Sequence, residues 1–589
     1  MKSLLTLYKR AFKRKYLVHA ILAILFMIGD VGIALAIPMI TKGIFTEINS
    51  GRNDLSYVYQ TGLLVVGIAI GAVITTILNN FFSQYLSTKI TADLRSELFR
   101  KVQDLSFSNV DKITSGALMT VIANDTGQIQ QLLLMSFRAI LRNPLTLVGA
   151  LIMAYITNAD LFLIILIAVL ILGVSIFFII TRAARIFVKL QEKNDNLNEK
   201  LIESISGARE IKVFGSEKAD RDQFKIVNDE YTNVVITANK RMALMDPIII
   251  LTSNLAIGAV LLTASYLVSV YTGEARVAMV GTISAYISYL QQIIMSLMML
   301  SMVAISISRA AVSADRIMLV LKTKIDIANA KEPQTGFEMR GDIEFRNVSF
   351  GYADEEGTAG SNTIEGISLK IKSQSVTGVI GSTGSGKTTL IQLIPRLYDV
   401  TQGQVLIDGI DVRDIDLRFL RENISFVTQD SLIFSGTLAS NIRQGKEDST
   451  EEDIEAAAVA SLADEFAKKA EHGYESEVTQ GGTNLSGGQK QRLSLARALI
   501  RKPKILILDD AFSAVDAKTE EKIKENLVKQ KQQTTIIVAQ KITSVRNCDN
   551  IIVLNNSGHL DGYGSHEELL KTSEVYREIY VSQFGGNHE

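Results

Sequence analysis

The chain lacks the cysteine content of a disulfide-rich protein and the positive charge of a protein that binds polyanions. Cys548 is its single cysteine, so a framework of intramolecular disulfides is excluded. The formal net charge at pH 7 is −1, and this balance implies no polyanionic partner. The sequence contains no internal repeat and no low-complexity segment. With 589 residues, the chain is too long for one compact domain.

The N-terminus also lacks the short apolar core and small-residue cleavage site of a secretory signal. A basic cluster between Lys2 and Lys15 precedes an apolar run from Tyr16 to Ile40. That run is long enough for a membrane-spanning helix, and the basic cluster favours a cytoplasmic N-terminus.

Apolar residues are concentrated in the first half of the chain, which contains six candidate membrane spans. They cover about residues 16–44, 57–82, 132–157, 161–181, 247–271 and 277–305. The connections after the second and fourth spans are long and charged, whereas the other three are short and poor in Lys and Arg. This asymmetry places the long connections and both chain ends in the cytoplasm. We therefore predict a multi-pass protein of the cell membrane, which excludes a soluble or nucleic-acid-binding protein.

The two long connections keep helical spacing over residues 83–103 and 182–206. A helix from about 57 to 103 would be about 70 Å long at ~1.5 Å per residue, whereas the hydrocarbon core is only ~30 Å thick. The surplus must project into the cytoplasm, and the turns near Asp104–Gly116 and Gly207–Asp220 form its tips. Each turn could be a simple helical hairpin tip.

The pattern breaks down over residues 321–342, which we interpret as a linker, and strands then alternate with helices from Ile343 to about residue 580. Within this α/β region, a β-rich run from Ser375 to Ile380 precedes an amphipathic helix that begins at Thr389. Between them lies a predicted phosphate-binding loop, Gly381, Ser382, Thr383, Gly384, Ser385, Gly386, Lys387 and Thr388.

This strand–loop–helix order is the context that a phosphate-binding loop requires. Its glycines let backbone N–H groups curl round the phosphates of a nucleotide, and the helix N-terminus adds positive potential. Lys387 is predicted to reach the β- and γ-phosphates, while the Thr388 hydroxyl is predicted to face Mg²⁺. Thr389 is also assigned to the ATP site.

About a hundred residues later the chain reads Leu485, Ser486, Gly487, Gly488 and Gln489. This pair of motifs, in this order, resembles the ATP-binding cassette (ABC) ATPases, and the six spans with long extensions resemble ABC exporter half-transporters. The resemblance implies a helical membrane domain over 1–320, fused through the linker to an α/β P-loop nucleotide-binding domain over 343–580. It also implies that the two turns are coupling segments which contact the cassettes.

The same resemblance assigns further residues to the ATP site. Asp509, at the end of the apolar strand from Lys504, is expected to hold Mg²⁺ directly or through water. Tyr352 is expected to stack on adenine, although it could be an ordinary tyrosine at a strand end. Gln429 resembles the glutamine that contacts Mg²⁺ and senses the coupling segments. Asp516 belongs to the loop that crosses to the opposite cassette.

Two positions depart from the family pattern. Asp510 stands where the family has the glutamate that polarises the attacking water. Its side chain is one methylene shorter, which retracts the carboxylate by ~1.5 Å. A misplacement of ~1 Å can lower a reaction rate by ~100-fold. Gln540 stands where the family has histidine, and an amide cannot carry the charge of imidazole or shuttle a proton. Either change alone could be tolerated drift. Together they predict a site that binds ATP and turns it over poorly.

The motif from Ser486 to Gln489 is intact, and in the family it acts on the ATP of the opposite cassette. Ser486 and the amides of Gly487 and Gly488 are expected to cap that γ-phosphate. A homodimer would contain two weak sites, whereas a non-identical partner with Glu and His at the matching positions would give one competent site. The chain therefore resembles the degenerate-site subunit of heterodimeric bacterial multidrug exporters, an ATP hydrolase coupled to transport.

The membrane half indicates the cargo only weakly. Asp30 in the first span could attract a cationic compound, or it could bond a neighbouring helix or lie near the water interface. Gln291 and Gln292 in the sixth span could line a cavity or bond between helices. We expect an amphipathic small molecule or peptide as cargo. A lipid or glycolipid flippase, an importer of the exporter fold and a non-transporting regulatory subunit stay open as alternatives.

Overall fold

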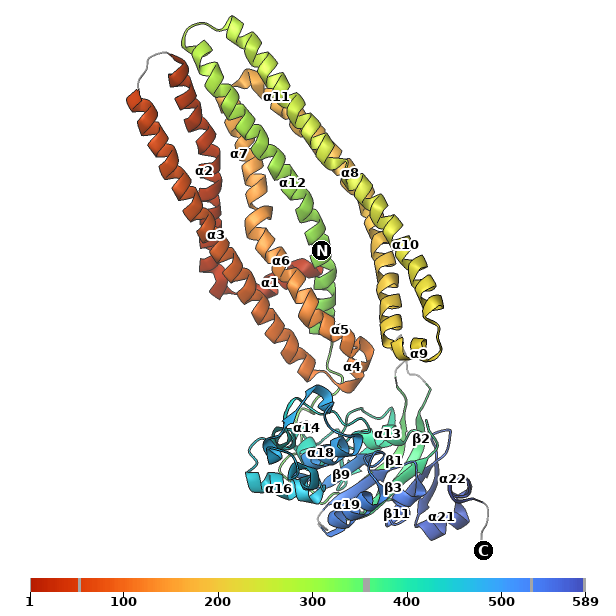
Figure 1. Ribbon diagram of the computed structural model, residues 1–589. Coiled ribbons are helices and arrows are strands. Elements are labelled where there is room, and N and C mark those ends of the chain that lie inside the picture. The colour runs from red at the N-terminus through yellow and green to blue at the C-terminus, as the bar shows by residue number, and fades with distance from the viewer. Residues whose placement is uncertain (1, 51–54, 353–360, 530–532, 586–589) are drawn as a thin grey trace. The chain divides into compact units, whose positions relative to one another are not determined.

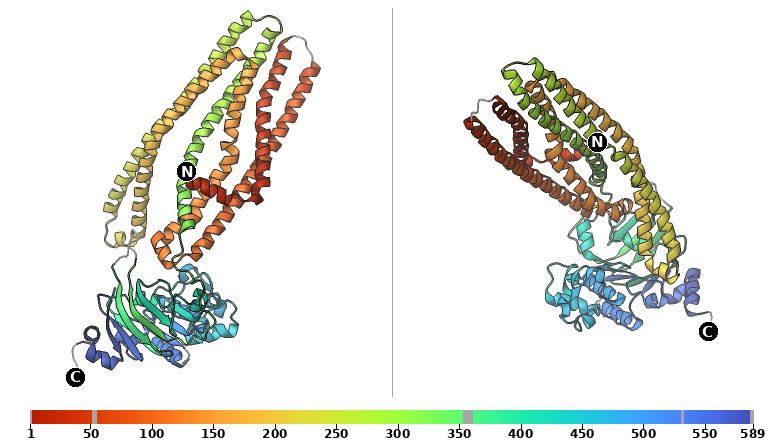
Figure 2. Two further views of the ribbon diagram at one scale, coloured as in Figure 1. Left: turned by 180° about the vertical axis from the view of Figure 1, so that it is seen from behind. Right: turned by 45° about the horizontal axis from the view of Figure 1, so that its top comes forward.

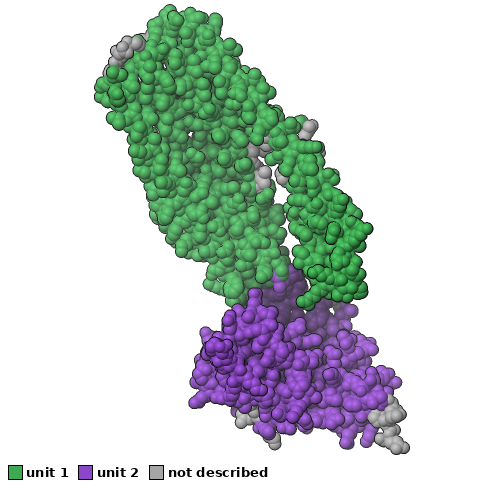
Figure 3. Space-filling view, in the orientation of Figure 1, with its two compact units in different colours: residues 1–103, 116–322 green, residues 104–115, 323–589 purple. Residues whose placement is uncertain are grey.

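The computed structural model describes residues 2–50, 55–352, 361–529 and 533–585. The chain divides into two compact units, which Figure 3 shows in different colours. The first comprises Met1–Gln103 and Gly116–Lys322, and the second comprises Asp104–Ser115 and Thr323–Glu589. The short segment 104–115, predicted as a coupling segment, thus belongs to the unit that also contains the nucleotide motifs.

The first unit is entirely helical (Figure 1). Its α-helices are α1 (Lys2–Ala11), α2 (Leu17–Ser50), α3 (Leu55–Asp104), α5 (Ser115–Thr120), α6 (Thr126–Met135), α7 (Arg142–Thr157), α8 (Ala159–Ser206), α9 (Ala208–Val213), α10 (Glu217–Met242), α11 (Met245–Val270) and α12 (Glu274–Lys322). Within the described residues six helical stretches are long and apolar enough to cross a membrane. The prediction of six spans is therefore confirmed.

The long extensions are also confirmed as continuous helices. Helix α3 has 50 residues and α8 has 48, so each is more than ~70 Å long at ~1.5 Å per residue. Helix α10 packs along the extension of α8, as the views in Figure 2 show. The six-residue α9 closes the tip of this pair at the second predicted coupling turn.

The third span is interrupted by two π-helical turns, Val121–Asp125 and Ser136–Ile140. Pro144 explains the second one, because it has no N–H to donate to the carbonyl of Ile140. The N–H of Leu141 accordingly donates to Ser136, five residues back, at 3.2 Å. Such insertions are frequent at functional sites, and hydropathy alone does not predict them.

The basic N-terminal cluster is held against α3. Arg10 pairs with Glu97 at 2.5 Å, and Lys15 pairs with Asp93 at 2.6 Å. The Tyr16 hydroxyl donates to the same Asp93 carboxylate at 2.8 Å. The cluster therefore fixes the start of α2 beside the extension of α3, in addition to any interaction with a membrane surface.

The second unit is built on a six-stranded sheet in the order β12-β11-β3-β10-β9-β6, parallel except for β12. A four-stranded antiparallel sheet has the order β2-β1-β4-β5, and β7 pairs with β8. The strands are β1 (Ile343–Phe350), β2 (Ile364–Ile371), β3 (Val376–Gly381), β4 (Gln402–Ile407), β5 (Ile410–Asp411), β6 (Ile424–Val427), β7 (Gly436–Thr437), β8 (Glu477–Val478), β9 (Ile505–Asp509), β10 (Thr534–Val538), β11 (Asn550–Leu554) and β12 (Leu560–Gly564).

The helices of this unit cover the six-stranded sheet, so that every residue of β9 and β10 is buried. A strand covered on both faces reads as a continuous apolar run, which is why the region was recognisable from sequence. The helices are α4 (Phe107–Ile113), α13 (Lys387–Gln392), α14 (Leu417–Asn423), α15 (Leu438–Arg443), α16 (Glu451–Ala460), α17 (Asp464–Ala467), α18 (Gly487–Leu499), α19 (Ala517–Lys529), α20 (Ile542–Val545), α21 (His566–Thr572) and α22 (Glu574–Phe584).

The segment predicted as a linker does not hang free of the second unit. The backbone N–H groups of Arg340, Gly341 and Asp342 all donate to the Asp408 carboxylate at 2.7–3.2 Å. Gln334 exchanges backbone hydrogen bonds with Asp414 and Asp416 at 2.7 and 2.9 Å. This part of the chain therefore belongs to the fold of the α/β unit, a contact that composition does not reveal.

Candidate functional site

Four loops meet at one edge of the six-stranded sheet. The strands β3, β10, β9 and β6 are consecutive neighbours and run parallel, so the loops at their carboxyl ends share an edge. These loops carry the predicted phosphate-binding loop after β3, Gln540 after β10, Asp510 after β9 and Gln429 after β6. The fold thus brings together residues that are up to about 160 positions apart in the sequence.

The phosphate-binding loop has the backbone that its glycines predict. Gly384 and Gly386 have φ values of +86° and +87°, a region that favours glycine. A Cβ on Gly386 would lie 2.5 Å from the Cγ2 atom of Ile364. The Lys387 Nζ atom lies across the loop and donates to the carbonyls of Gly381 and Ser382 at 3.0 and 2.8 Å. Burial lowers the pKa of Lys387, and the carboxylates of Asp509 and Asp510 oppose that shift.

Thr388 and Asp509 meet as the sequence predicts. The Thr388 hydroxyl donates to the Asp509 carboxylate at 3.2 Å. Asp509 is only 4% exposed, and burial raises its pKa, while the Thr388 hydrogen bond opposes the shift. Among the described residues, no group of three or more His, Cys, Asp or Glu side chains is arranged to hold a metal ion by itself. The pair is therefore an incomplete oxygen set of the kind that holds Mg²⁺ together with substrate phosphates.

Tyr352 stands beside the helix that follows the loop. Its hydroxyl lies 3.1 Å from the Thr389 hydroxyl and 3.3 Å from the Gln392 side-chain oxygen. Its ring makes edge contacts with Phe350 and Tyr398, with centroids 5.1 and 5.4 Å apart. Tyr352 is thus part of an aromatic cluster at the edge of the site, rather than an isolated tyrosine at a strand end.

The sequence analysis missed Tyr398, which links this cluster to α4. The Tyr398 hydroxyl donates to the Asp111 carboxylate at 2.6 Å, and its ring contacts that of Phe107 with centroids 6.3 Å apart. Tyr398 is 8% exposed, and burial together with this hydrogen bond raises its pKa. One side chain therefore touches both the predicted adenine-stacking residue and the predicted coupling segment. No motif marks it in the sequence.

The two positions that depart from the family pattern face each other. The Gln540 amide lies 3.5 Å from the Asp510 carboxylate, the long limit of a hydrogen bond. Asp510 has φ of +48°, and its N–H donates to Val538 at 3.1 Å. Burial raises the pKa of Asp510, whereas Lys387 and Lys541 oppose the shift. The two substituted side chains therefore lie side by side at the carboxyl ends of β9 and β10, and slow turnover at this site stays a prediction.

Gln583, from the C-terminal helix α22, was not found from sequence. Its amide donates to the carbonyl of Gln540 at 2.8 Å, and its side-chain oxygen accepts from the N–H of Ile542 at 2.8 Å. These two bonds hold the backbone that carries Gln540. Because the residues are 43 positions apart, local sequence carries no signal of the contact.

The Ser486–Gln489 motif begins helix α18. Ser486 and Gln489 cap the helix reciprocally, with N–H to side-chain distances of 2.8 and 3.4 Å. A Cβ on Gly488 would lie 2.8 Å from the Ala514 carbonyl oxygen, so glycine permits this close approach. Gln491, also missed from sequence, donates to the Ser513 hydroxyl at 2.8 Å and accepts from the Ala514 N–H at 2.9 Å.

Asp516 and Gln429 occupy the ends of loops. Asp516 accepts from the N–H of Thr519 at 3.0 Å, and this hydrogen bonding lowers the pKa of Asp516. Gln429 lies in an exposed loop, two positions after the end of β6. Both residues stay predicted site residues, and neither touches the phosphate-binding loop in the described structure.

Two of the three membrane residues predicted to line a cargo cavity, Asp30 and Gln292, bond to neighbouring helices. Asp30 accepts from the Thr76 hydroxyl and pairs with Arg142, both at 2.8 Å. The Gln292 amide donates to the Ala34 carbonyl at 3.0 Å. Gln291 is exposed. Asp30 therefore bonds neighbouring helices, one of the possibilities that the sequence left open, and a role for it in attracting a cationic compound stays a prediction.

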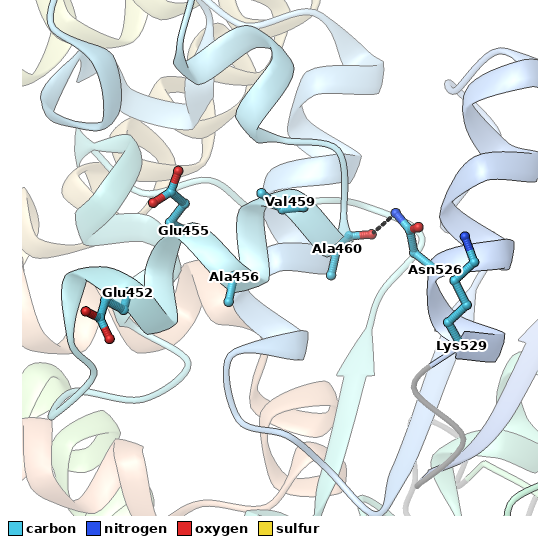
Figure 4. A pocket seen from close by; sticks show the side chains of 7 residues that line it. All are labelled: Glu452, Glu455, Ala456, Val459, Ala460, Asn526 and Lys529. Carbon is cyan, nitrogen blue, oxygen red and sulfur yellow. Dashed lines mark hydrogen bonds between the residues drawn. The ribbon is translucent and has the colours of Figure 1, made fainter.

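A large hollow of the second unit lies elsewhere (Figure 4). It has a volume of about 570 Å³ and lies between α16 and α19. Its lining residues are Glu452, Glu455, Ala456, Val459, Ala460, Asn526 and Lys529. Asn526 donates to the Ala460 carbonyl at 3.4 Å. No predicted site residue lines this hollow.

Comparisons with known proteins agree with this arrangement. Residues 20–297 match the ABC transporter transmembrane region, and residues 364–513 match the ABC transporter family of ATP-binding domains. The uncharacterized ABC transporter ATP-binding protein YfiB of Bacillus subtilis is 34% identical over 575 residues, which cover 98% of each chain. The putative multidrug export ATP-binding/permease protein YgaD of the same organism is 30% identical over 97% of this chain and 98% of its own.

Two further proteins extend the comparison. The ATP-dependent lipid A-core flippase of Methylococcus capsulatus is 31% identical over 90% of this chain and 87% of its own. A solved structure of a bacterial Atm1-family ABC exporter with ATP bound superposes with a TM-score of 0.80, at 25% identity, over 98% of this chain and 99% of that one. The chain therefore belongs to the ABC transporter family, as a half-transporter of the exporter fold with one membrane region and one ATP-binding domain.

Proposed function

We propose that this chain is one subunit of a heterodimeric ATP-driven exporter. Its own ATP site binds nucleotide but turns it over poorly, and its Ser486–Gln489 motif completes a competent site on a non-identical partner. That partner carries Glu and His at the positions of Asp510 and Gln540. Hydrolysis at the partner's site resets a cycle in which the two cassettes close and the membrane cavity changes the side to which it opens.

A single observation carries the proposal. Asp510 and Gln540 lie 3.5 Å apart, whereas the predicted nucleotide-binding residues are all present, with Lys387 lying across the phosphate-binding loop and Thr388 bonded to Asp509. Random loss of function would affect binding and catalytic residues alike. Substitution confined to the group that activates water supports a chain kept for binding ATP.

The exposed surface of the α8–α10 extension supports a second subunit. Ile205, Val213 and Phe214 are 72%, 79% and 81% exposed, and they lie beyond the membrane spans. Exposed apolar side chains clustered at one tip mark an interaction surface. We assign this tip, which includes α9, to contact with the partner's cassette.

The charge pattern supports the orientation. The basic cluster at the N-terminus pairs with α3 at Asp93 and Glu97, on the extension that projects beyond the membrane span. By the positive-inside rule, both chain ends and the ATP-binding domain lie in the cytoplasm, where ATP is found.

Mg²⁺ fits the pair Thr388 and Asp509. Asp509 is a buried carboxylate that accepts a hydrogen bond from Thr388, and a carboxylate has further lone pairs that suit a cation. With Gln429 from the neighbouring strand end, these residues would hold the ion, which neutralises charge on the phosphates.

The cargo we propose is an amphipathic small molecule or peptide, in agreement with the relative described as a putative multidrug exporter. The relative described as a lipid A-core flippase favours a lipid as the second candidate. Stimulation of ATP hydrolysis by drugs or by lipids, measured on the reconstituted heterodimer, separates the two. Uptake into inside-out compared with right-side-out vesicles separates export from import.

The decisive experiment uses the heterodimer with the partner's catalytic glutamate changed to glutamine. We expect transport to fall by about 100-fold, the cost of losing the positioned base, whereas Asp510→Asn in this chain should change it by less than about twofold. A regulatory subunit predicts the opposite for the partner, namely intact transport. Brisk ATP hydrolysis by this chain alone, as a symmetric pair, would refute the heterodimer.

A further inference from the structure

An apolar groove of about 510 Å³ lies between α2 and α7 in the membrane region. Its lining residues are Ile28, Val31, Gly32, Leu35, Pro144, Leu145, Val148, Gly149 and Ile152. A Cβ on Gly149 would lie 2.4 Å from the Cδ1 atom of Leu35, so glycine here lets the two helices approach and form the floor of the groove. Val148 and Ile152 are exposed.

One end of this groove is charged. Asp30 is adjacent to the groove residues of α2, and Arg142 precedes those of α7. The two side chains pair at 2.8 Å, and the carboxylate also accepts from Thr76. Arg138 lies one turn before Arg142 and donates to the Asn80 carbonyl at 3.2 Å.

The guanidinium groups have donors to spare. The Nε atoms of Arg138 and Arg142 are buried and have no hydrogen-bond partner among the described residues. The Arg142 side chain is nevertheless 43% exposed, whereas that of Asp30 is 12% exposed. Two guanidinium groups against one carboxylate leave a local formal charge of +1.

The charged end lies near a membrane boundary. Helix α7 has 16 residues, so Arg142 lies about 24 Å along the helix from its far end at ~1.5 Å per residue. The hydrocarbon core is about 30 Å thick. With the cytoplasmic N-terminus proposed above, this end of the groove lies in the inner-leaflet half of the membrane, about 6 Å short of the boundary of a ~30 Å hydrocarbon core. A long arginine side chain can extend over that distance toward a lipid phosphate.

We propose that the groove binds an anionic phospholipid of the inner leaflet. One acyl chain lies along Val148 and Ile152, and the phosphate oxygens accept from the Arg142 guanidinium. The inference goes beyond the proposed function, because it requires neither a heterodimer nor that the lipid be the cargo.

The charge balance selects this occupant. An unpaired guanidinium donor at membrane depth is costly, and a phosphate offers paired acceptors in the geometry of its fork. A cationic amphiphile would meet the net positive charge. A zwitterionic headgroup brings its own cation, which cancels most of the attraction. A purely apolar chain would leave the guanidinium donors without acceptors.

The absence of tryptophan from the chain allows a direct test. Ile152→Trp places one fluorophore in the groove of the full-length chain in lipid nanodiscs, and bromine-labelled lipids quench it on contact. At low mole fraction, dibrominated phosphatidylglycerol should quench about fivefold more than dibrominated phosphatidylcholine, as expected for one charge-assisted pair. Equal quenching by the two lipids overturns the proposal.

Matched variants locate the effect. Val174→Trp, at an exposed position of α8 in the fourth span (67% exposed, against 53% for Ile152), should show no preference between the two lipids. In the Ile152→Trp chain, Arg142→Gln removes both the proposed phosphate donor and the surplus positive charge and should abolish the preference, whereas Arg142→Lys should keep part of it. A preference that survives neutralisation assigns the lipid to another site and also overturns the proposal. Because the readout needs no ATP, its failure is distinct from failure of the exporter function.

Discussion

The two nucleotide-facing surfaces of this chain differ in what has been retained. At the carboxyl edge of β9 and β10, Asp510 stands where the family has a longer glutamate, and Gln540 stands where it has histidine. At the start of α18, by contrast, Ser486 and Gln489 cap the helix and Gln491 ties it to the loop at Ser513 and Ala514. The first surface departs from the family pattern at two positions, whereas the second keeps both the motif and the contacts that support it.

This difference indicates which chemical steps still depend on the chain. Residues that hold phosphates and residues that complete a neighbouring site act by position, so their packing must persist. A residue that activates water acts by proton affinity and by the reach of its side chain. Both determinants can change, as in Asp510 and Gln540, while the surrounding fold is untouched.

The largest effect is expected when the family's residues are restored at positions 510 and 540. In this chain Asp510→Glu with Gln540→His should raise turnover at its own site by about 100-fold, because the carboxylate regains ~1.5 Å of reach toward the water. The measurement is single-turnover ATP hydrolysis by the heterodimer in which the partner's glutamate is glutamine. Asp510→Asn with Gln540→His is the matched control and should stay at the background rate. An unchanged rate in the restored variant would show that the weakness has another cause.

The next largest effect is expected from a change in the Ser486–Gln489 motif. Ser486→Ala should lower hydrolysis at the partner's site by about 10-fold, less than the ~100-fold of a lone oxyanion donor, because two glycine amides remain. ATP binding at this chain's own site should not change. The helix also loses a cap worth ~1 kcal/mol. Ser565→Ala, which removes the equivalent capping box from α21, controls for that loss and should leave hydrolysis unaltered.

What the sequence predicted well follows from strong local patterns. Six apolar spans, the uninterrupted α3 and the strand β9 all carry a continuous periodic or apolar signal. The phosphate-binding loop was predictable because its residues are consecutive and because Gly384 and Gly386 adopt positive φ values that favour glycine.

Contacts between distant segments could not be predicted. Tyr398 bonds Asp111 across 287 positions, and Gln583 reaches Gln540 across 43. The π-helical turn before Pro144 is likewise hidden, because hydropathy is unaffected by one extra residue per turn. Asp30 is unusual for a membrane span, and the sequence shows this. Its partner Arg142 belongs to another helix, and the charge pattern along one helix cannot show which residue of another helix pairs with it.

A smaller effect should come from the tie between α4 and the aromatic cluster. Tyr398→Phe removes the hydrogen bond to Asp111 while the ring contacts with Tyr352 and Phe107 stay. We expect stimulation of ATP hydrolysis by cargo to fall about fivefold, because only part of the ~1.5 kcal/mol that a hydrogen bond to a charged group contributes is expected to act on coupling. The affinity for ATP, measured with a fluorescent analogue, should change by less than about twofold.

Tyr563→Phe is the matched control for that variant. It removes a hydroxyl that donates to the Lys370 carbonyl at 2.8 Å, away from α4. If both variants lose stimulation equally, the loss reflects general destabilisation. If only Tyr398→Phe loses it, the coupling segment acts on the site through this hydroxyl.

The smallest effect is expected from the contact of Gln583, in α22, with the backbone that carries Gln540. Gln583→Glu keeps an oxygen for the Ile542 N–H but replaces the donor to the Gln540 carbonyl with a second acceptor. In the parent chain the change should be nearly silent, because Gln540 contributes little to catalysis. In the Gln540→His, Asp510→Glu background it should lower the restored rate by about twofold, since a neutral hydrogen bond contributes only ~1 kcal/mol.

Hydrolysis at the partner's site is the internal control. A change that depends on the background in this way would show that α22 positions the substituted residue, whereas equal loss in both backgrounds would assign Gln583 to stability alone.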